Sequence, residues 1–118
     1  MERLLLVEHN RLFREGLALL LEWRTGLSSV QADSLDEAKA ILEANQKKLA
    51  CIIVDLDLPD GEGTELLKEL DGIPVLALIR SRNVERRAEA IGLGADQVLR
   101  TTGPAEKIAA AVERLIGR

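Results

Sequence analysis

Two carboxylates close the most apolar stretch of this chain. Asp55 and Asp57 follow the run of apolar residues at 51–54, and a proline, a third acid and two glycines come directly after them. A carboxylate at the end of a buried strand can act as a nucleophile or as a ligand for a hard cation. Residues 51–63 are therefore the first candidate for a functional site.

The elements that must position these acids follow from an alternation of short apolar runs with helical patterns. Strands are predicted at 3–8, 27–32, 49–55, 73–79 and 95–100, and helices at 11–23, 34–45, 64–70, 83–94 and 104–117. Asn10, the capping box Ser34–Glu37 and Pro104 are typical helix starts, and Pro59 to Gly63 indicate a turn. This alternation predicts an α/β fold with a parallel sheet, right-handed crossovers and helices on both faces.

The carboxyl ends of the predicted strands bring the reactive side chains to one edge. Glu8, Asp55, residues 79–81 and residues 100–101 all fall at such ends. Ligands of open parallel sheets bind outside the carboxyl ends of the strands, where the strand order reverses. Asp55 and Asp57 are therefore expected at the end of their strand because the carboxyl edge of the sheet borders the candidate site.

The composition of the chain limits which other functions it can have. The 118 residues suit one domain, 1–118, with 47% hydrophobic residues and a net charge of −4 that disfavours nucleic-acid binding by the domain itself. Cys51 is the only cysteine, which excludes an intrachain disulfide and a cysteine-based metal cluster. No apolar run reaches membrane-spanning length, so we expect no membrane contact and a cytoplasmic location.

Two stretches resemble a known family. "LLLVEHNRLFREGLALLLE" and "IIVDLDLPDGEGTELLKEL" are similar to the receiver domains of two-component response regulators, and "LFREGL" is similar to receivers that precede a LuxR-type DNA-binding domain. The resemblance covers essentially the whole chain. It implies a flavodoxin-like (βα)5 fold with the strand order 2-1-3-4-5.

The resemblance also implies chemistry at named positions. Asp55 corresponds to the phosphoacceptor, which takes a phosphoryl group from a kinase phosphohistidine. The family's Mg²⁺ is held by an acidic pair, by the phosphoacceptor and by the carbonyl two residues later. Here these are Glu8 with His9, Asp55 and Asp57. A lysine after the last strand and a Thr or Ser after the fourth contact the phosphoryl oxygens.

Several of those positions are changed in this chain. His9 replaces the second acid, and a neutral imidazole is a poor ligand for Mg²⁺, so we expect weak binding of this ion. A protonated His9 paired with Asp55 or Glu8 would mimic the missing cation. Ile79 stands where the family has Thr or Ser, followed by Arg80. The lysine position falls on Arg100 or on Thr101, depending on the alignment.

We therefore predict a non-enzymatic receiver in which phosphorylation of Asp55 is weakened or lost and output comes from protein–protein contact. The expected partner is a sensor histidine kinase or another signalling protein. The face made by residues 83–117 is a candidate output and homodimer surface, and Val98 stands there in place of the family's switch aromatic. The residues assigned to that surface are Arg82, Arg86, Arg87 and Val98.

Two alternatives remain open at this point. The first is an ordinary phosphorylatable receiver that tolerates these changes and controls an attached DNA-binding domain. The second, more remote, is a phosphatase of the haloacid-dehalogenase type, in which Asp55 would be the nucleophile and Asp57 the general acid. That motif normally lies on the first strand rather than the third, and the later acidic metal motif is missing.

Overall fold

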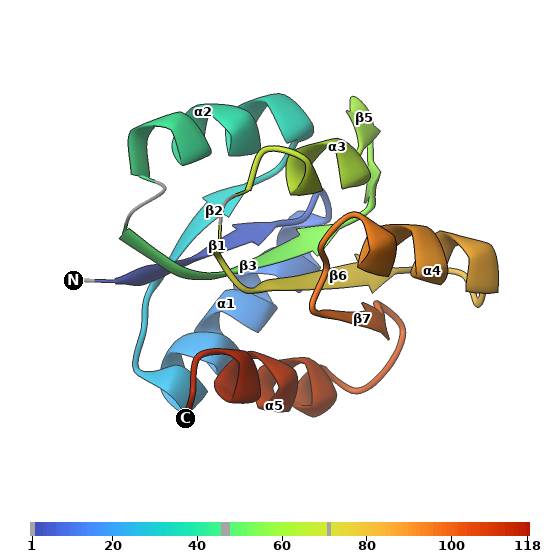
Figure 1. Cartoon of the computed structure of the whole chain (residues 1–118). Coiled ribbons are helices and arrows are strands. Elements are labelled where there is room, and N and C mark those ends of the chain that lie inside the picture. The colour runs from blue at the N-terminus through green and yellow to red at the C-terminus, as the bar shows by residue number, and fades with distance from the viewer. Residues whose placement is uncertain (1, 46–47, 71) are drawn as a thin grey trace.

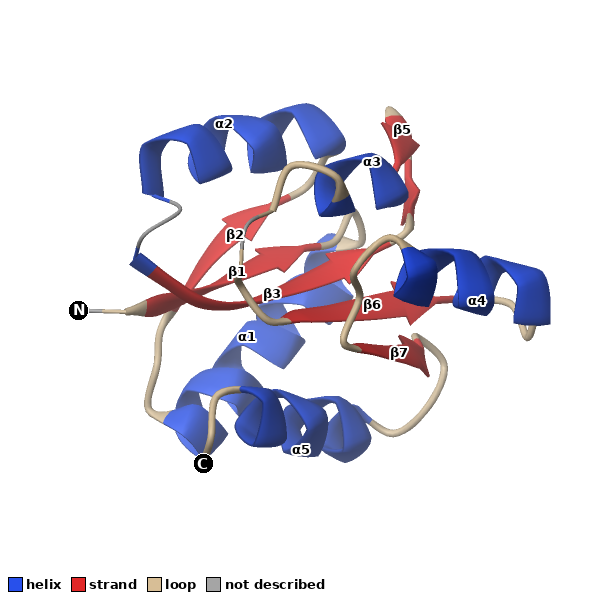
Figure 2. Cartoon of the chain, viewed as in Figure 1, coloured by secondary structure: helices blue, strands red, loops and turns tan. Residues whose placement is uncertain are grey.

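The computed structural model describes residues 2–45, 48–70 and 72–118 and contains a five-stranded parallel sheet between two layers of helices (Figure 1). The strands of this sheet are β1 (Arg3–Val7), β2 (Ser29–Ala32), β3 (Leu49–Asp55), β6 (Val75–Ile79) and β7 (Gln97–Arg100). The helices are α1 (Arg11–Thr25), α2 (Leu35–Asn45), α3 (Thr64–Leu67), α4 (Val84–Gly92) and α5 (Ala105–Leu115). Figure 2 shows α1 and α5 on one face of the sheet and α2, α3 and α4 on the other.

The strand order β2-β1-β3-β6-β7 confirms the predicted topology. The last two strands carry the labels β6 and β7 instead of 4 and 5 because a small antiparallel hairpin lies between β3 and α3. This hairpin consists of β4 (Asp57–Leu58) and β5 (Gly61–Glu62). Only a turn was predicted there. The order reverses next to β1, so the carboxyl ends of β1 and β3 flank the position where ligands of such sheets bind.

The sheet is buried on both faces, which explains the unbroken apolar runs. Alternate residues of β1 enter different cores because successive side chains of a strand point to opposite faces. Leu5 and Val7 pack in the core beneath α2, α3 and α4, whereas Leu4 and Leu6 pack beneath α1 and α5. These two cores hold the strand ends in place and so fix the edge of the sheet that carries the acids.

The hairpin after β3 is tied to the start of α2. The Asp60 carboxylate accepts hydrogen bonds from the backbone N–H groups of Leu35 (2.8 Å) and Asp36 (3.0 Å). These bonds lower the pKa of Asp60. Ser34 caps the same helix by accepting from the N–H of Glu37 at 3.1 Å, which is one of the two hydrogen bonds of the predicted capping box. Asp60, one acid of the predicted turn, therefore has a structural role at the start of α2.

Three local predictions need correction. Leu12, which the helical pattern places with the buried residues of α1, is 83% exposed. Pro104 lies just before α5 as its N-cap rather than in its first turn, since its ψ of 135° is extended. The helix predicted at 64–70 is only Thr64–Leu67. Among the described residues, none of the helices combines the length and apolar character needed to cross a membrane.

Candidate functional site

Glu8 and Asp55 lie side by side at the carboxyl ends of two neighbouring strands. Val7 and Val54 are register partners in β1 and β3, so the next residue of each strand emerges at the same edge. Both side chains are buried, with exposed fractions of 1% for Glu8 and 0% for Asp55. The structure thus brings together the two acids that the sequence placed at this rim.

The Asp55 carboxyl is only partly satisfied by the protein. The backbone N–H of Asp57 donates to its Oδ1 at 2.9 Å, whereas Oδ2 is buried and has no hydrogen-bond partner in the described part of the chain. Burial, followed by the neighbouring Glu8 carboxyl, raises the pKa of Asp55 from 3.8 to about 7. Without a bound cation, Asp55 is therefore mostly protonated below about pH 7 and mostly ionised above it.

Gly63 shapes the loop that follows Asp55. A Cβ atom at this position would lie 2.6 Å from the Asp55 carbonyl oxygen and 2.8 Å from Cα of Leu56. Both neighbours are backbone atoms, so they cannot rotate away. The Gly63 N–H also donates to the Leu56 carbonyl at 3.0 Å. Only glycine allows this close return of the loop to the end of β3.

His9 points away from the acids. Its ring is exposed, and Nδ1 lies 3.3 Å from the Asp33 carbonyl oxygen. No hydrogen bond or ion pair joins it to Glu8 or Asp55 in the described structure, so the hypothetical charge pair is not formed here. The reason is local: the Asn10 N–H donates to the Glu8 carboxylate at 3.3 Å, which keeps Glu8 inward and leaves the next side chain outward.

The residues after β6 and β7 separate into three environments. Ile79 is fully buried in the core beneath α2, α3 and α4. Arg80 and Thr101 line a cavity of about 290 Å³ together with Glu8, and the buried Thr101 hydroxyl has no hydrogen-bond partner in the described chain. Arg100 lines a different pocket, and its Nη2 is 3.5 Å from the Arg80 carbonyl oxygen.

The acidic set at this edge fits a divalent cation only in part. Glu8, the unpartnered Oδ2 of Asp55 and the carbonyl of Asp57 offer oxygen atoms, which Mg²⁺ prefers. Among the described residues, however, no group of three His, Cys, Asp or Glu side chains is arranged to hold a metal ion. Mg²⁺ usually keeps several waters and needs only one or two carboxylates, so a weak site is compatible with this set.

The residues assigned to an output surface have different environments. Arg82 is exposed, whereas Arg86 lies 2.8 Å from Asp57 and 2.9 Å from Glu62. Arg87 donates to the Val98 carbonyl at 2.8 Å. The Val98 side chain is 2% exposed, so it belongs to the core and is not available on the surface as expected.

The ionic contacts of Arg86 with Asp57 and Glu62 were not predicted from the sequence. Its guanidinium reaches from α4 to the hairpin after Asp55 and joins the two by a pair of ionic contacts. The signal was the presence of Asp57 and Glu62 in a turn, because like charges opposite each other on a hairpin are unfavourable and a nearby cation relieves this repulsion. Spacing alone could not identify which of the neighbouring arginines supplies it.

Comparison with known proteins gives one consistent result. A family model described as response regulator receiver domain matches residues 4–113. The transcriptional regulatory protein PmrA of Pectobacterium parmentieri is 34% identical over 120 residues, covering 98% of this chain and 53% of PmrA. FixJ of Azorhizobium caulinodans is 36% identical over 110 residues, covering 89% of this chain and 50% of FixJ. This chain thus spans about half the length of these relatives.

Solved structures agree in fold. A two-component response regulator from Clostridium difficile superposes with a TM-score of 0.90 at 22% identity, covering 100% of this chain and 98% of that one. A response regulator from Burkholderia pseudomallei, solved with a phosphorylated aspartic acid, a calcium ion and citrate, has a TM-score of 0.81 at 28% identity. That match covers 99% of this chain and 69% of the other.

Proposed function

The chain belongs to the family of two-component response regulator receiver domains, and from this membership we propose that it is a receiver in which phosphorylation of Asp55 is weakened and output depends on protein–protein contact. Membership also argues against the phosphatase alternative, since Asp55 ends the third strand of a receiver fold rather than the first strand of a phosphatase. We propose that the domain itself is not an enzyme and acts in the cytoplasm.

The observation that supports this proposal is the pairing of Glu8 and Asp55 without a third carboxylate. A carboxylate can attack phosphorus only when it is ionised and when the negative charge gathered there is neutralised. The pKa of Asp55, raised to about 7, leaves only part of this carboxyl ionised near neutral pH when no cation is bound. His9, which stands at the second acidic position, lies against Asp33 and adds no negative charge.

Mg²⁺ would be held by Glu8, Asp55 and the Asp57 carbonyl, with waters completing its shell. When bound, this ion neutralises negative charge on the phosphoryl group and favours the ionised form of Asp55. We propose that it binds weakly, because the described residues offer two carboxylates where the family offers three.

The chain also has fewer of the other side chains with which the family contacts a phosphoryl group. Ile79 carries no hydrogen-bonding group and is packed in the core, so it cannot take the part of the family's Thr or Ser. We propose that Thr101, and not Arg100, stands where the family has lysine, since Thr101 shares a cavity with Glu8 and Arg80. Arg80 is then a cation of the pocket that Glu8 and Thr101 line, where it can attract an incoming phosphoryl group.

For partners, we propose a sensor histidine kinase or another signalling protein that contacts the face formed by α4, β7 and α5. Arg82 and Arg87 remain candidates on that face, whereas Arg86 is engaged with Asp57 and Glu62. A homodimer through the same face is the other arrangement that the family suggests.

A second candidate function is favoured by the relatives. PmrA and FixJ are transcriptional regulatory proteins about twice as long as this chain. An ordinary phosphorylatable receiver that controls an attached DNA-binding domain would retain Asp55, Asp57 and Gly63 as this chain does.

One experiment separates the two candidates. The protein is incubated with acetyl phosphate and Mg²⁺ and its intact mass is measured, with Asp55→Asn as the matched control. We expect little or no phosphoryl adduct in either protein. A stoichiometric adduct that is absent in Asp55→Asn would support the ordinary receiver and overturn the weakened one.

A further inference from the structure

Helix α1 carries a row of apolar side chains that the described part of the chain leaves uncovered. Leu12, Leu19 and Trp23 are exposed at 83%, 71% and 80%, and the exposed Gly16 lies between them. These four residues, which we call the α1 stripe, follow one line along the helix. The buried residues of α1 lie on its opposite side, in the core beneath α1 and α5. Contiguous apolar surface of this kind is typical of an interaction site.

Gly16 is an unusual residue for the centre of this face. Glycine inside a helix is unfavourable relative to alanine. An added Cβ atom at Gly16 would meet no atom within 4 Å, so the fold of the described chain does not require glycine here. A glycine does allow another chain to approach the helix closely. It leaves room between Leu12 and Leu19 for a large side chain of a partner.

The spacing of the α1 stripe is the same from either end of the helix. Its members follow one another at intervals of four, three and four residues, with large side chains at both outer positions. Two copies of α1 packed antiparallel about a twofold axis therefore place Leu12 against Trp23 of the second copy. The same packing places Gly16 against Leu19 of the second copy. Each inner leucine thus meets a glycine, and the face is complementary to itself.

Charged residues beside the α1 stripe favour the antiparallel arrangement. Arg11 and Glu22 lie on the same side of the stripe, near opposite ends of the helix. Antiparallel packing brings Arg11 of one copy within one helical turn of Glu22 of the other, whereas parallel packing places each beside its own like charge. Arg11 also pairs with Glu15 of its own helix at 3.1 Å, so one exposed arginine would lie between two carboxylates.

Charge disfavours a membrane surface as the occupant. Helices that lie on membranes have lysine and arginine along their polar face, which attract anionic lipids. The α1 stripe is instead bordered by Glu15 and Glu22, on a chain of net charge −4. These acids would be repelled by an anionic lipid surface, whereas a second copy of the chain supplies Arg11 to them.

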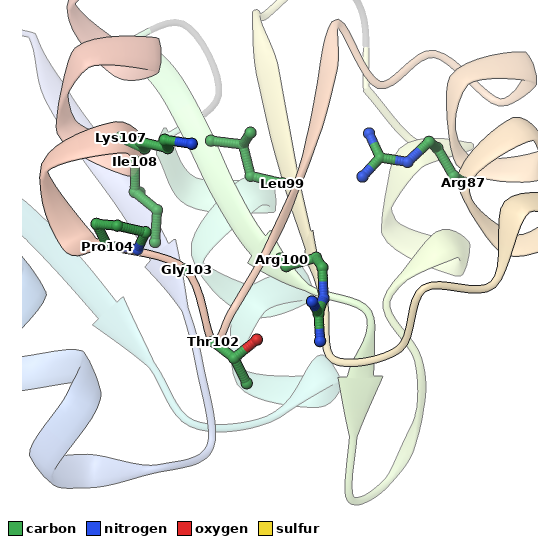
Figure 3. Close-up of a pocket in the computed structure, with 8 residues that line it drawn as sticks. All are labelled: Arg87, Leu99, Arg100, Thr102, Gly103, Pro104, Lys107 and Ile108. Atoms are coloured by element: carbon green, nitrogen blue, oxygen red, sulfur yellow. The ribbon is translucent and has the colours of Figure 1, made fainter.

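We propose that the chain forms a symmetric homodimer through the α1 stripe, with the two α1 helices antiparallel. This surface is separate from the output face considered above, since none of the described residues that line the pocket between β7 and α5 belongs to the stripe (Figure 3). The inference goes beyond the proposed function, because it requires neither phosphorylation of Asp55 nor contact with a kinase. A single helix face is smaller than a standard interface of about 800 Å² per partner, so we expect a weak dimer, with a Kd on the order of 100 μM.

The test uses the whole chain at concentrations from about 10 μM to about 1 mM, on both sides of the expected Kd. Sedimentation equilibrium should show the average mass rising from that of one chain toward that of two. Trp23 is the only tryptophan, so its fluorescence reports on the stripe directly. We expect its emission to move to shorter wavelength as the side chain becomes buried, with the same dependence on concentration as the mass.

A matched pair of variants tests whether the α1 stripe is responsible. Leu19→Glu replaces an apolar contact by a charge, so we expect the Kd to rise about tenfold or more. Because Leu19 is exposed in the single chain, this variant should fold as the native protein does. Ile91→Glu makes the same change at an exposed residue of α4 and should leave the Kd unchanged. An equal loss in both variants, or a loss in Ile91→Glu alone, would place the contact elsewhere and overturn the proposal.

Two charge variants test the antiparallel orientation. Arg11→Glu and Glu22→Arg each bring like charges together at both ends of the dimer, so each variant alone should dimerise about fivefold more weakly than the native chain. An equimolar mixture of the two should recover the native affinity, because each variant then meets the opposite charge in the other. In a parallel dimer neither variant alone would weaken the contact, since like charges already face each other there.

Three further results would overturn the proposal. The first is a native chain that remains a monomer up to about 1 mM, far above the expected Kd. The second is a dimer whose formation leaves the emission of Trp23 unchanged. The third is an unchanged affinity in both separate charge variants. Because these measurements use no phosphoryl donor, their failure is distinct from the appearance of a phosphoryl adduct on Asp55.

Discussion

Arg86 Nη2 lies 2.8 Å from Oδ1 of Asp57, the residue whose backbone N–H donates to the Asp55 carboxylate. The same Nη2 atom lies 2.9 Å from the Glu62 carboxylate, so one arginine of α4 joins both strands of the hairpin after β3. The position of α4 is thereby connected to the loop that follows Asp55. A substitution in α4 should therefore alter the hairpin, and a substitution in the hairpin should alter α4.

Replacing Arg86 by alanine should loosen this connection. The arginine is only partly exposed, at 22% of its side chain, but its acidic partners are more open, so we expect a loss of about 1 kcal/mol in the free energy of unfolding. Amide hydrogen exchange in the hairpin at residues 57–62 should become faster. The control is Arg82→Ala, which alters an exposed arginine nearby. Equal exchange rates in both variants would show that Arg86 does not restrain the hairpin.

Replacing His9 by aspartate should strengthen Mg²⁺ binding. The His9 ring lies against Asp33, whereas the shorter aspartate is free to turn toward Glu8 and Asp55 and provides the oxygen ligand that Mg²⁺ prefers over imidazole. We expect a gain of about tenfold or more in affinity, measured by calorimetric titration, or about 1.4 kcal/mol. His9→Asn, which has a side-chain oxygen but no charge, should gain much less. An unchanged affinity in His9→Asp would mean that another feature limits the site.

Stability should depend on pH through Asp55. Its pKa is raised from 3.8 to about 7 in the folded protein, so between these values the folded state holds a proton that the unfolded state has released. The free energy of unfolding should therefore decrease as pH rises from about 4 to about 7, by no more than about 4 kcal/mol. Denaturant titrations with a chelator present measure this.

Asp55→Asn is the control for that dependence. Asparagine keeps the size of the side chain and cannot ionise, so the variant should lose most of the decrease and be more stable than the native protein at pH 8. A native protein whose stability rises over the same pH range would contradict the raised pKa of Asp55.

Gly63 and Gly16 offer a matched pair of glycine substitutions. Gly63→Ala places a Cβ 2.6 Å from the Asp55 carbonyl, so the loop must move and the protein should lose about 2 kcal/mol or more of stability. Gly16 lies inside α1 with no atom within 4 Å of the added Cβ, so Gly16→Ala should stabilise by up to about 1 kcal/mol. Thermal unfolding of both variants measures the contrast. Similar effects of the two changes would refute the close approach at Gly63.

The fold was predictable because its strands are unbroken apolar runs between helical patterns. Leu4 to Val7 and Ile52 to Val54 are fully buried, as such runs require when helices cover both faces of the sheet. The meeting of Glu8 and Asp55 followed from the same alternation, since neighbouring parallel strands end at one edge. The exposure of Leu12 was not predictable, because a helical stripe does not identify which of its apolar members face solvent.

The details of the site were less predictable because they depend on side-chain direction. His9 follows Glu8 in the sequence, yet Glu8 is buried whereas His9 is exposed beside the Asp33 carbonyl, and residue type alone does not encode these directions. Val98 occupies an output position by alignment, yet it is buried in the core. The ion pair between Arg86 and Asp57 joins residues that are far apart in the sequence, so no local spacing predicts it.

The central claim is that Asp55 reacts slowly because the groups facing it have changed. The most direct measurement is the rate of phosphoryl adduct formation, followed by intact mass with phosphoramidate and Mg²⁺, for the native chain and for His9→Asp/Ile79→Thr. Ile79→Thr alone should cost stability, since it places a hydroxyl in the core, so the double variant must first be shown to be folded. We predict slow or no phosphorylation of the native chain and a rate at least about tenfold higher in the folded double variant, lost when Asp55→Asn is added. Rapid, complete phosphorylation of the native chain, with no gain in the double variant, would contradict the claim.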